Sequence, residues 1–360
     1  MRSYLVLAAL LWLSGDAGAA SDSGEDPASG RIYSTREERR QAGLDHELTD
    51  WLTVGALGEL EYQDERFTTR SAPSKTGSGD FSRTLELALE LKPLRFAKAE
   101  VIYEYQADRG SERHSIDEAL VSFDTRDLEL QLGRIILPFG MYYSHFASGP
   151  LLEFGETRGS GAVLSWGPHD RQDLAGFIYH GGAQKLGTRD IWSKLDWGLA
   201  AQVSPFDFLT LGASYLSDLA DAKAHLLGEN GNRYASRVGA FGAYAVVGLE
   251  HVEITVEFLG ALGSFRELDA DRNRPAAWNI ELAYLPIARL EVALRYEGSR
   301  ALKDAPQCRA GVSVSWRVTH RASLTFEYLQ GRFARGFGED SAGRELRRVE
   351  HLGAQFSLAL

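Results

Sequence analysis

The sequence has little of what stabilises or localises many other classes of protein. Its 360 residues include one cysteine, Cys308, so no disulfide framework can hold the fold. No stretch reaches the roughly 20 apolar residues that a membrane-spanning helix needs. The net charge of −11 is not the basic excess typical of nucleic-acid binding. Zinc-ligand spacing, phosphate loops and calcium loops are also missing, so we predict no metal, no cofactor and no nucleic-acid partner.

The N-terminus has the features of a secretory signal peptide. Arg2 supplies a positive charge, residues 4–13 form a short apolar core, and Ala17-Gly18-Ala19 fits the cleavage rule. The stretch 21–30 is rich in Ser, Asp and Gly, which is typical of disorder. We therefore expect a signal peptide over 1–20, a partly disordered periplasmic segment over 21–48, and one folded domain over 49–360.

From Thr49 onward, apolar residues recur at every second position. Leu85, Leu87 and Leu89 alternate with Glu86 and Ala88, and the same period returns along the rest of the chain. A period of two indicates strands with one apolar face. We count about sixteen such segments, each near the roughly 9–11 residues that a tilted membrane strand needs.

The connections between these segments alternate between short and long. The short ones include residues 92–95, 125–127, 204–207, 286–289 and 319–321, and the long ones include 63–80, 135–159, 220–235, 263–276 and 332–345. Short periplasmic turns and long outside loops are typical of outer-membrane barrels. A soluble sandwich or propeller gives no reason for this alternation. The sequence therefore predicts an all-β fold, a transmembrane antiparallel β-barrel of about sixteen strands in the bacterial outer membrane.

The ends of the apolar rows support this fold. Aromatic residues such as Tyr62, Tyr105 and Trp316 stand near them, as expected for rings at the membrane interfaces. The final segment alternates up to Leu360 and resembles the C-terminal signal read by the outer-membrane assembly machinery, although that signal ends on Phe. Lipid offers no partner to backbone groups, so the sheet must close. At about sixteen strands, side chains cannot fill the interior and an aqueous channel remains.

The third long connection, residues 135–159, is unusually apolar for a surface loop. Loops of this length are usually functional. In general porins the third outside loop folds inward and narrows the pore. By that resemblance Glu153 and Glu156 would lie at the constriction, with Arg158 and Arg134 nearby. The alternative is that the loop packs on the rim or at a subunit interface.

The polar faces of the strands would direct further charges into the lumen. These include Glu59, Glu86, Glu100, Glu257, Arg295 and Arg317. Acids outnumber bases among the inward positions, and carboxylates lining a pore favour cations. The alternative is that the acids pair with bases and water and set no selectivity.

A short motif carries a closer resemblance. Gly133-Arg134, Pro138-Phe139-Gly140, Leu152-Glu153 and Gly155-Glu156-Thr157-Arg158 resemble the LbtU-type siderophore porins, as does the stretch 48–63. A family aspartate is replaced here by Gly149. The resemblance implies a barrel without a plug that takes up an iron–siderophore complex.

We therefore expect a porin for passive uptake of small solutes, with an adhesin or scaffold, or a barrel enzyme, as alternatives. Ser144 and His145 are adjacent in a loop, which is not a catalytic triad, and we predict solvated histidines and no catalytic residue. The expected partners are outer-membrane lipids, the assembly machinery and a small solute or siderophore. The identity of the solute and the presence of a homo-oligomer stay open.

Overall fold

The computed structural model describes residues 46–71, 75–167, 172–185, 195–222, 226, 233–234, 237–340 and 342–359. The expected signal peptide lies outside these residues, as does most of the segment 21–48. No helix within the described residues is long and apolar enough to cross a membrane.

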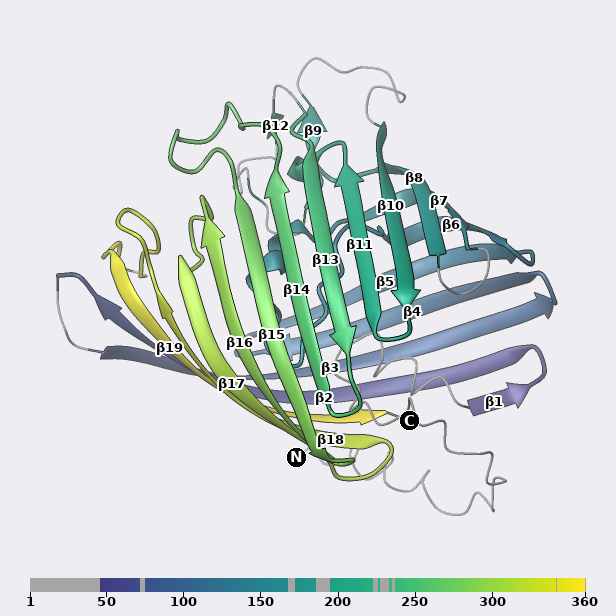
Figure 1. Cartoon of the computed structure of the whole chain (residues 1–360), viewed down its shortest axis with the longest axis horizontal. Coiled ribbons are helices and arrows are strands. Elements are labelled where there is room, and N and C mark those ends of the chain that lie inside the picture. Colours follow the sequence, from purple (N-terminus) through teal and green to yellow (C-terminus); the bar gives the residue numbers. More distant parts are fainter. Residues whose placement is uncertain are drawn as a thin grey trace. The chain divides into compact units, whose positions relative to one another are not determined.

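Sixteen strands of the described chain form one closed antiparallel barrel, as the sequence predicts. The strands are β2 (Leu52–Thr69), β3 (Lys75–Leu94), β4 (Ala97–Asp108), β5 (Ser111–Asp124), β6 (Leu128–Ile136), β7 (Arg158–Trp166), β8 (Gln172–His180), β10 (Leu195–Phe206), β11 (Leu209–Leu216), β13 (Ala240–Gly248), β14 (Val252–Ala261), β15 (Ala276–Ile287), β16 (Leu290–Arg300), β17 (Cys308–Arg317), β18 (Ala322–Arg332) and β19 (Leu346–Ala359). Each pairs with the strands before and after it in this order, and β13 to β16 cross in front of β2 to β5 in Figure 1.

The remaining elements are short. The strand β1 (His46–Thr49) pairs with the start of β2, and β9 (Gln184–Lys185) pairs in parallel with β12 (Arg233–Tyr234). Two 3-10 helices, η2 (Leu151–Gly155) and η5 (Leu219–Asp221), lie in connections between barrel strands.

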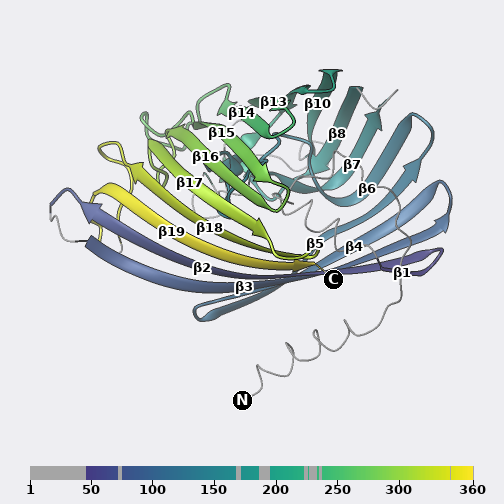
Figure 2. The ribbon, with the colours of Figure 1, turned by 60° about the horizontal axis from the view of Figure 1, so that its bottom comes forward.

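The barrel closes between its first and last strands. The strand β19 pairs with β2 over thirteen positions, from Leu346 opposite Thr69 to Ala359 opposite Leu57. Figures 1 and 2 both show the yellow end of the chain beside the purple and blue strands. This pairing leaves neither β2 nor β19 as an open edge, so the strand backbones find partners within the sheet.

The two faces of the sheet differ in the way that the period of two predicts. On β14, Val256 and Phe258 are exposed on the outer face, while Glu253 and Glu257 are buried on the inner face. The same alternation on β16 exposes Leu294 and buries Arg295. Large apolar side chains are thus exposed on the outside, and many of the buried side chains inside are polar. This is the reverse of a soluble core.

The connections depart from the expected alternation of short and long at two places. One is the connection between β4 and β5, which is only two residues long (109–110) although a long loop is expected at that end of the barrel. The other is the first long loop, between β2 and β3. Tight turns join strands at residues 95–96, 125–127, 207–208, 249–251 and 288–289, and long connections cover 137–157, 217–239, 262–275 and 333–345. The stretch 63–80, expected as a long loop, is mostly strand, because β2 runs to Thr69 and β3 begins at Lys75. Gln63 pairs with Asp80 and Arg66 with Gly77 in this extension. These residues are polar on both faces, so the apolar alternation that marks a strand is lost there.

Candidate functional site

The connection between β6 and β7, which we call loop L3 (residues 137–157), lies against the inner face of the barrel. Its apolar side chains explain why: Phe139 and Leu152 are fully buried in one cluster with Phe177 of β8 and Leu216 of β11. The helix η2 within the loop contacts β14, β15 and β16. The apolar composition of the loop thus reflects packing inside the barrel and not on its rim.

Carboxylates on the inner faces of four strands, β14, β15, β16 and β18, hold the backbone of L3. Glu257 accepts hydrogen bonds from the amides of Met141 and Tyr142, at 2.6 and 3.0 Å. Glu281 accepts from the His145 amide at 2.7 Å. Further along, Glu327 accepts from the Ser148 amide at 3.1 Å, and Glu297 accepts from the Leu151 amide at 2.7 Å. A carboxylate is a strong acceptor for backbone N–H groups, so each contact is charge-assisted.

Two arginines neutralise part of this charge beneath the loop. Arg295 donates to Glu281 at 2.8 Å, and its guanidinium lies 4.2 Å from the centre of the Phe146 ring. Arg309 donates to Glu297 at 2.5 Å. Both guanidinium groups also donate to the carbonyl oxygen of Gly149, at 3.3 and 3.1 Å. Both arginine side chains are therefore engaged by the loop backbone and by the carboxylates that hold it.

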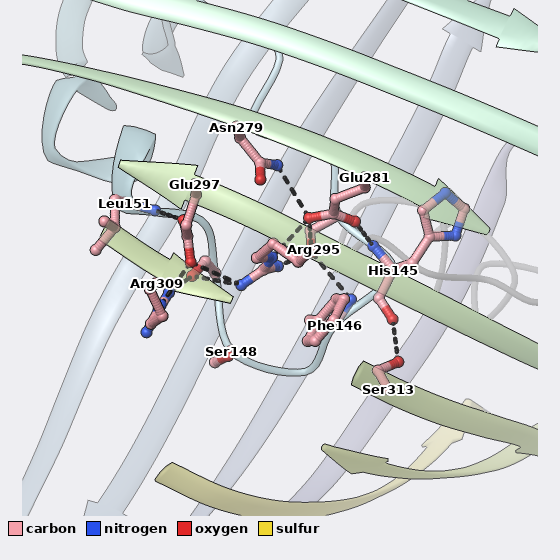
Figure 3. A network of polar contacts seen from close by, with 12 residues as sticks. His145, Phe146, Ser148, Leu151, Asn279, Glu281, Arg295, Glu297, Arg309 and Ser313 are labelled. Atoms are coloured by element: carbon pink, nitrogen blue, oxygen red, sulfur yellow. Dashed lines mark hydrogen bonds and ion pairs between the residues drawn. The ribbon is translucent and has the colours of Figure 1, made fainter. Parts of the chain in front are cut away.

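His145 binds four neighbouring strands at once. Its ring nitrogens Nδ1 and Nε2 lie 3.0 Å from Glu291 and 3.3 Å from Glu253. Its carbonyl oxygen accepts from Ser313 at 2.8 Å, and its amide donates to Glu281 (Figure 3). Burial alone lowers the pKa of His145, but the hydrogen bonds to Glu253 and Glu291 outweigh burial and raise the pKa to about 10. The ring is therefore a cation between two carboxylates.

The expectation of a solvated loop histidine is wrong for His145, which is only 4 % exposed. Strand alternation separates Glu253, Glu281 and Glu291 from the apolar face of their strands, but it does not show which loop residue meets them. Alternation assigns each side chain to one face of the sheet. It does not identify the partner of that side chain, because His145 is more than a hundred residues from Glu281 and Glu291 in the sequence.

A cavity of about 1120 Å³ lies between L3 and the strands opposite. On one side it is lined by loop residues, among them Met141, Tyr142 and Phe146. On the other side it is lined by the inner faces of β2 to β6 and β19. The carboxylates at this cavity are Glu59, Glu61, Glu90, Glu100, Glu104, Asp117, Glu118, Glu129, Glu153 and Glu156.

Three of the four residues expected at the loop constriction line this cavity. Glu153, Glu156 and Arg158 do so, and Arg158 pairs with Glu156 at 2.9 Å and with Asp117. Arg134 is not brought to them. It is exposed and does not line the cavity, and its Nε donates to the backbone carbonyl oxygen of Asp117 at 3.3 Å.

The residues expected to contribute charge to the lumen lie at three different places in the barrel. Glu59 and Glu100 line the cavity, and Glu86 is buried on the inner face of β3 opposite Glu104. Glu257 and Arg295 lie beneath L3, where they hold the loop. Arg317 ends β17 on the face of Ser313 and Ser315. Among the described residues, no group of His, Cys, Asp and Glu has the arrangement of a metal site.

Solved structures of similar fold are outer-membrane porins and channels. The outer-membrane channel DcaP of Acinetobacter baumannii matches with a TM-score of 0.58 and 12% identity, over 87% of this chain and 99% of that chain. Pseudomonas putida OprB matches with a TM-score of 0.58 and 10% identity, over 86% of this chain and 94% of that chain. Salmonella typhi OmpF, solved in complex with daunomycin, matches with a TM-score of 0.58 and 12% identity, over 86% and 98%.

Identities this low establish a common fold, and no more. No protein-family model matches the sequence, and neither does any curated protein. The fold that these structures share with the chain is the sixteen-stranded barrel.

Proposed function

We propose that the chain is a porin of the bacterial outer membrane, through which small solutes pass passively. The observation that carries the proposal is a closed barrel with an apolar outer face and a polar cavity inside. Exposed residues such as Val256, Leu294 and Phe326 form an outer face that lipid would solvate better than water. A sixteen-stranded barrel is also wide enough to keep an aqueous channel.

L3 would narrow that channel. The loop occupies the inner side of β14 to β18, so solutes pass between it and the opposite wall, where the cavity lies. Glu153, Glu156 and Arg158 stand on the loop side of this passage. A narrow place with low-dielectric walls focuses the field of such charges on a passing ion.

The decisive experiment is planar-bilayer recording of the purified, folded protein in potassium chloride. We expect stepwise, ohmic current increments as single molecules insert. The folded state is checked independently by heat-modifiable migration on gels. A folded, membrane-inserted protein that passes no current would contradict the porin proposal and favour an adhesin or scaffold.

An iron–siderophore complex is the solute that the sequence motif between Gly133 and Arg158 suggests. This part of the proposal rests on that resemblance alone. Growth under iron limitation, with each of several siderophores and with or without the protein, tests it. Equal growth in both strains on every siderophore would remove siderophores as the solute while leaving the channel in place.

The proposed partners follow from the same fold. Membrane lipids would cover the exposed outer face, and β19 would present the alternating segment that the assembly machinery reads. A homo-oligomer is proposed by analogy with general porins. Cross-linking in native membranes tests it, since a ladder of bands is expected from an oligomer and a single band from a monomer.

A further inference from the structure

The outer face of β18 and β19 changes from apolar to basic towards one end of the barrel. Tyr328 and Leu352 lie directly opposite each other and are 44 % and 50 % exposed on this face. Four residues further along the same face come Arg332 on β18 and Arg348 on β19. The long connection 333–345 joins the two strands at this end, and long connections are typical of the extracellular side. The two arginines therefore lie outside the apolar band, on the extracellular side.

Arg332 and Arg348, which we call the arginine pair, are directly opposite each other in the register of the two strands. Their positions alternate with the buried Gly331 and Val349, so both guanidinium groups leave the sheet on its outer face. Side chains opposite each other have Cβ atoms about 4.5–5.5 Å apart, and like charges there destabilise a sheet. An anion that accepts hydrogen bonds from both groups would remove this repulsion.

Other charged residues on this face leave it with a basic excess. Glu350 lies on it, two residues from Arg348. Asp64 of β2 pairs with Arg66 of the same strand at 2.9 Å. Arg300, exposed at the end of β16, lies on the face that carries Tyr296. Together with the arginine pair, this makes four arginines and two carboxylates near the extracellular ends of these strands.

The height of the arginine pair matches the head groups of a bilayer. Four residues extend about 13 Å along a strand, which is about 10 Å along the membrane normal at a tilt of about 40°. Head groups occupy roughly 5–7 Å on each side of the hydrocarbon core. Tyrosines such as Tyr328 are typical of the boundary between the two regions. The long side chains of Arg332 and Arg348 therefore reach the level of head-group phosphates.

We propose that the arginine pair binds the phosphate group of a lipid in the outer leaflet. Each guanidinium group can donate two parallel N–H groups to phosphate oxygens. The acyl chains of the same molecule then cover Tyr328 and Leu352. A phosphorylated glycolipid such as lipid A has both parts, whereas free phosphate has only the first. The arginine pair lies on the outer wall, so this binding does not depend on what the channel conducts.

Native mass spectrometry of the purified, folded protein in detergent, titrated with lipid A, tests the site. Arg332→Gln with Arg348→Gln should weaken binding of the first lipid A molecule about tenfold, equivalent to about 1.4 kcal/mol. Arg289→Gln is the matched control, because Arg289 is an exposed arginine at the turn 288–289 on the other side of the membrane. The control should bind lipid A as the unchanged protein does.

Two further probes separate the phosphate from the rest of the lipid. Dephosphorylated lipid A should bind to the unchanged protein as weakly as lipid A binds to the double variant. Inorganic phosphate at millimolar concentration should not displace lipid A, because it makes no contact with the apolar band.

Thermal stability distinguishes lipid binding from a purely structural role of the arginine pair. Without lipid, the double variant should unfold at the same temperature as the unchanged protein or at a higher one, because repulsion between like charges is removed. With lipid A, the unchanged protein should become the more stable of the two, since a ligand stabilises the folded state that binds it. A double variant that is less stable without lipid, and binds lipid A normally, would give the arginine pair a structural role only.

The other contradicting outcomes are distinct. Equal lipid A binding by the double variant and the unchanged protein would overturn the proposal. Displacement of lipid A by inorganic phosphate would make this a site for free anions. Normal lipid A binding together with loss of a cross-linked oligomer would assign the arginine pair to a contact between copies of the chain. Potassium chloride current should be equal in all variants, so failure of the porin proposal would leave this test unaffected.

Discussion

At the scale of single residues, consecutive side chains in a strand face opposite surroundings. Val256 is 42 % exposed on the outside of β14, while Glu257 is 1 % exposed and binds two amides of L3. The sequence predicts this division of faces, because Val256 and Glu257 fall on alternate positions. It predicts water around Glu257, however, and the structure places the loop there instead. Truncation of Glu257 would therefore leave two partly buried amides without their acceptor.

Val256→Arg tests the outer face. The substitution places a guanidinium at the middle of a strand that lipid would cover, and should lower the free energy of unfolding by about 2–4 kcal/mol. Urea unfolding in lipid vesicles, followed by tryptophan fluorescence, measures the change, with Val256→Leu as the control. An unchanged unfolding free energy would mean that this face of β14 does not contact lipid.

His145 predicts a pH dependence with a definite sign. Its pKa rises from 6.5 to about 10 in the folded protein because Glu253 and Glu291 hold the protonated ring. Because the pKa of His145 is higher in the folded protein, protonation of its ring stabilises the folded position of L3. This stabilisation is complete at pH values below the unfolded-state pKa of 6.5, and it is lost as the pH rises through about 10. We expect quiet single-channel current up to about pH 9 and noise above about pH 10.

The variant His145→Gln separates this effect from other titrations. Glutamine can still bond one carboxylate but carries no charge, so the noise should be present at every pH and show no step near the pKa of His145. A step that persists in the variant would assign the pH dependence to another group.

At the scale of elements, the strands follow from the sequence and the place of L3 does not. Alternation of apolar and polar residues marks each strand from β14 to β19. The connections 249–251 and 288–289 are short because tight turns join antiparallel neighbours. The apolar residues Phe139 and Leu152 show that the loop must be covered. They do not show which residues cover the loop. Phe177 and Leu216, which pack against it, are distant in sequence and reach it only because the barrel closes. Arg134 differs for a related reason: its place directly before the expected loop 135–159 does not show whether its side chain reaches the cavity.

Deletion of residues 144–153 tests the loop as an element. The deletion removes His145 and the groups that meet Arg295, Glu297 and Glu327, so the narrow place should widen and single-channel conductance should rise. A matched deletion within the connection 333–345, away from L3, should leave conductance nearly unchanged. Equal conductance of the loop deletion and the intact protein would mean that L3 does not limit the current.

At the scale of the whole molecule, charge sets a dependence on salt. The chain carries a net charge of −11, and ten carboxylates line the cavity. The Debye length falls to about 3 Å at 1 M salt, so the field of these groups then barely reaches the centre of the passage. Cation preference, measured from reversal potentials, should therefore weaken steadily from about 0.1 M to about 1 M salt. A preference independent of salt would point to size exclusion in place of charge.

The attachment of L3 also has a mechanical consequence. A thin cylindrical wall resists stretching along its hydrogen bonds but bends easily, so lateral pressure can flatten it into an oval. Here one segment leaves the wall between β6 and β7 and is tied to β14, β15, β16, β17 and β18. We therefore expect L3 to fix the distance between β6 and β7 on one side of the barrel and β14 to β18 on the other. The length of L3 should then set the inner width of the barrel. The cross-section of the barrel should stay constant when bilayer tension or thickness changes.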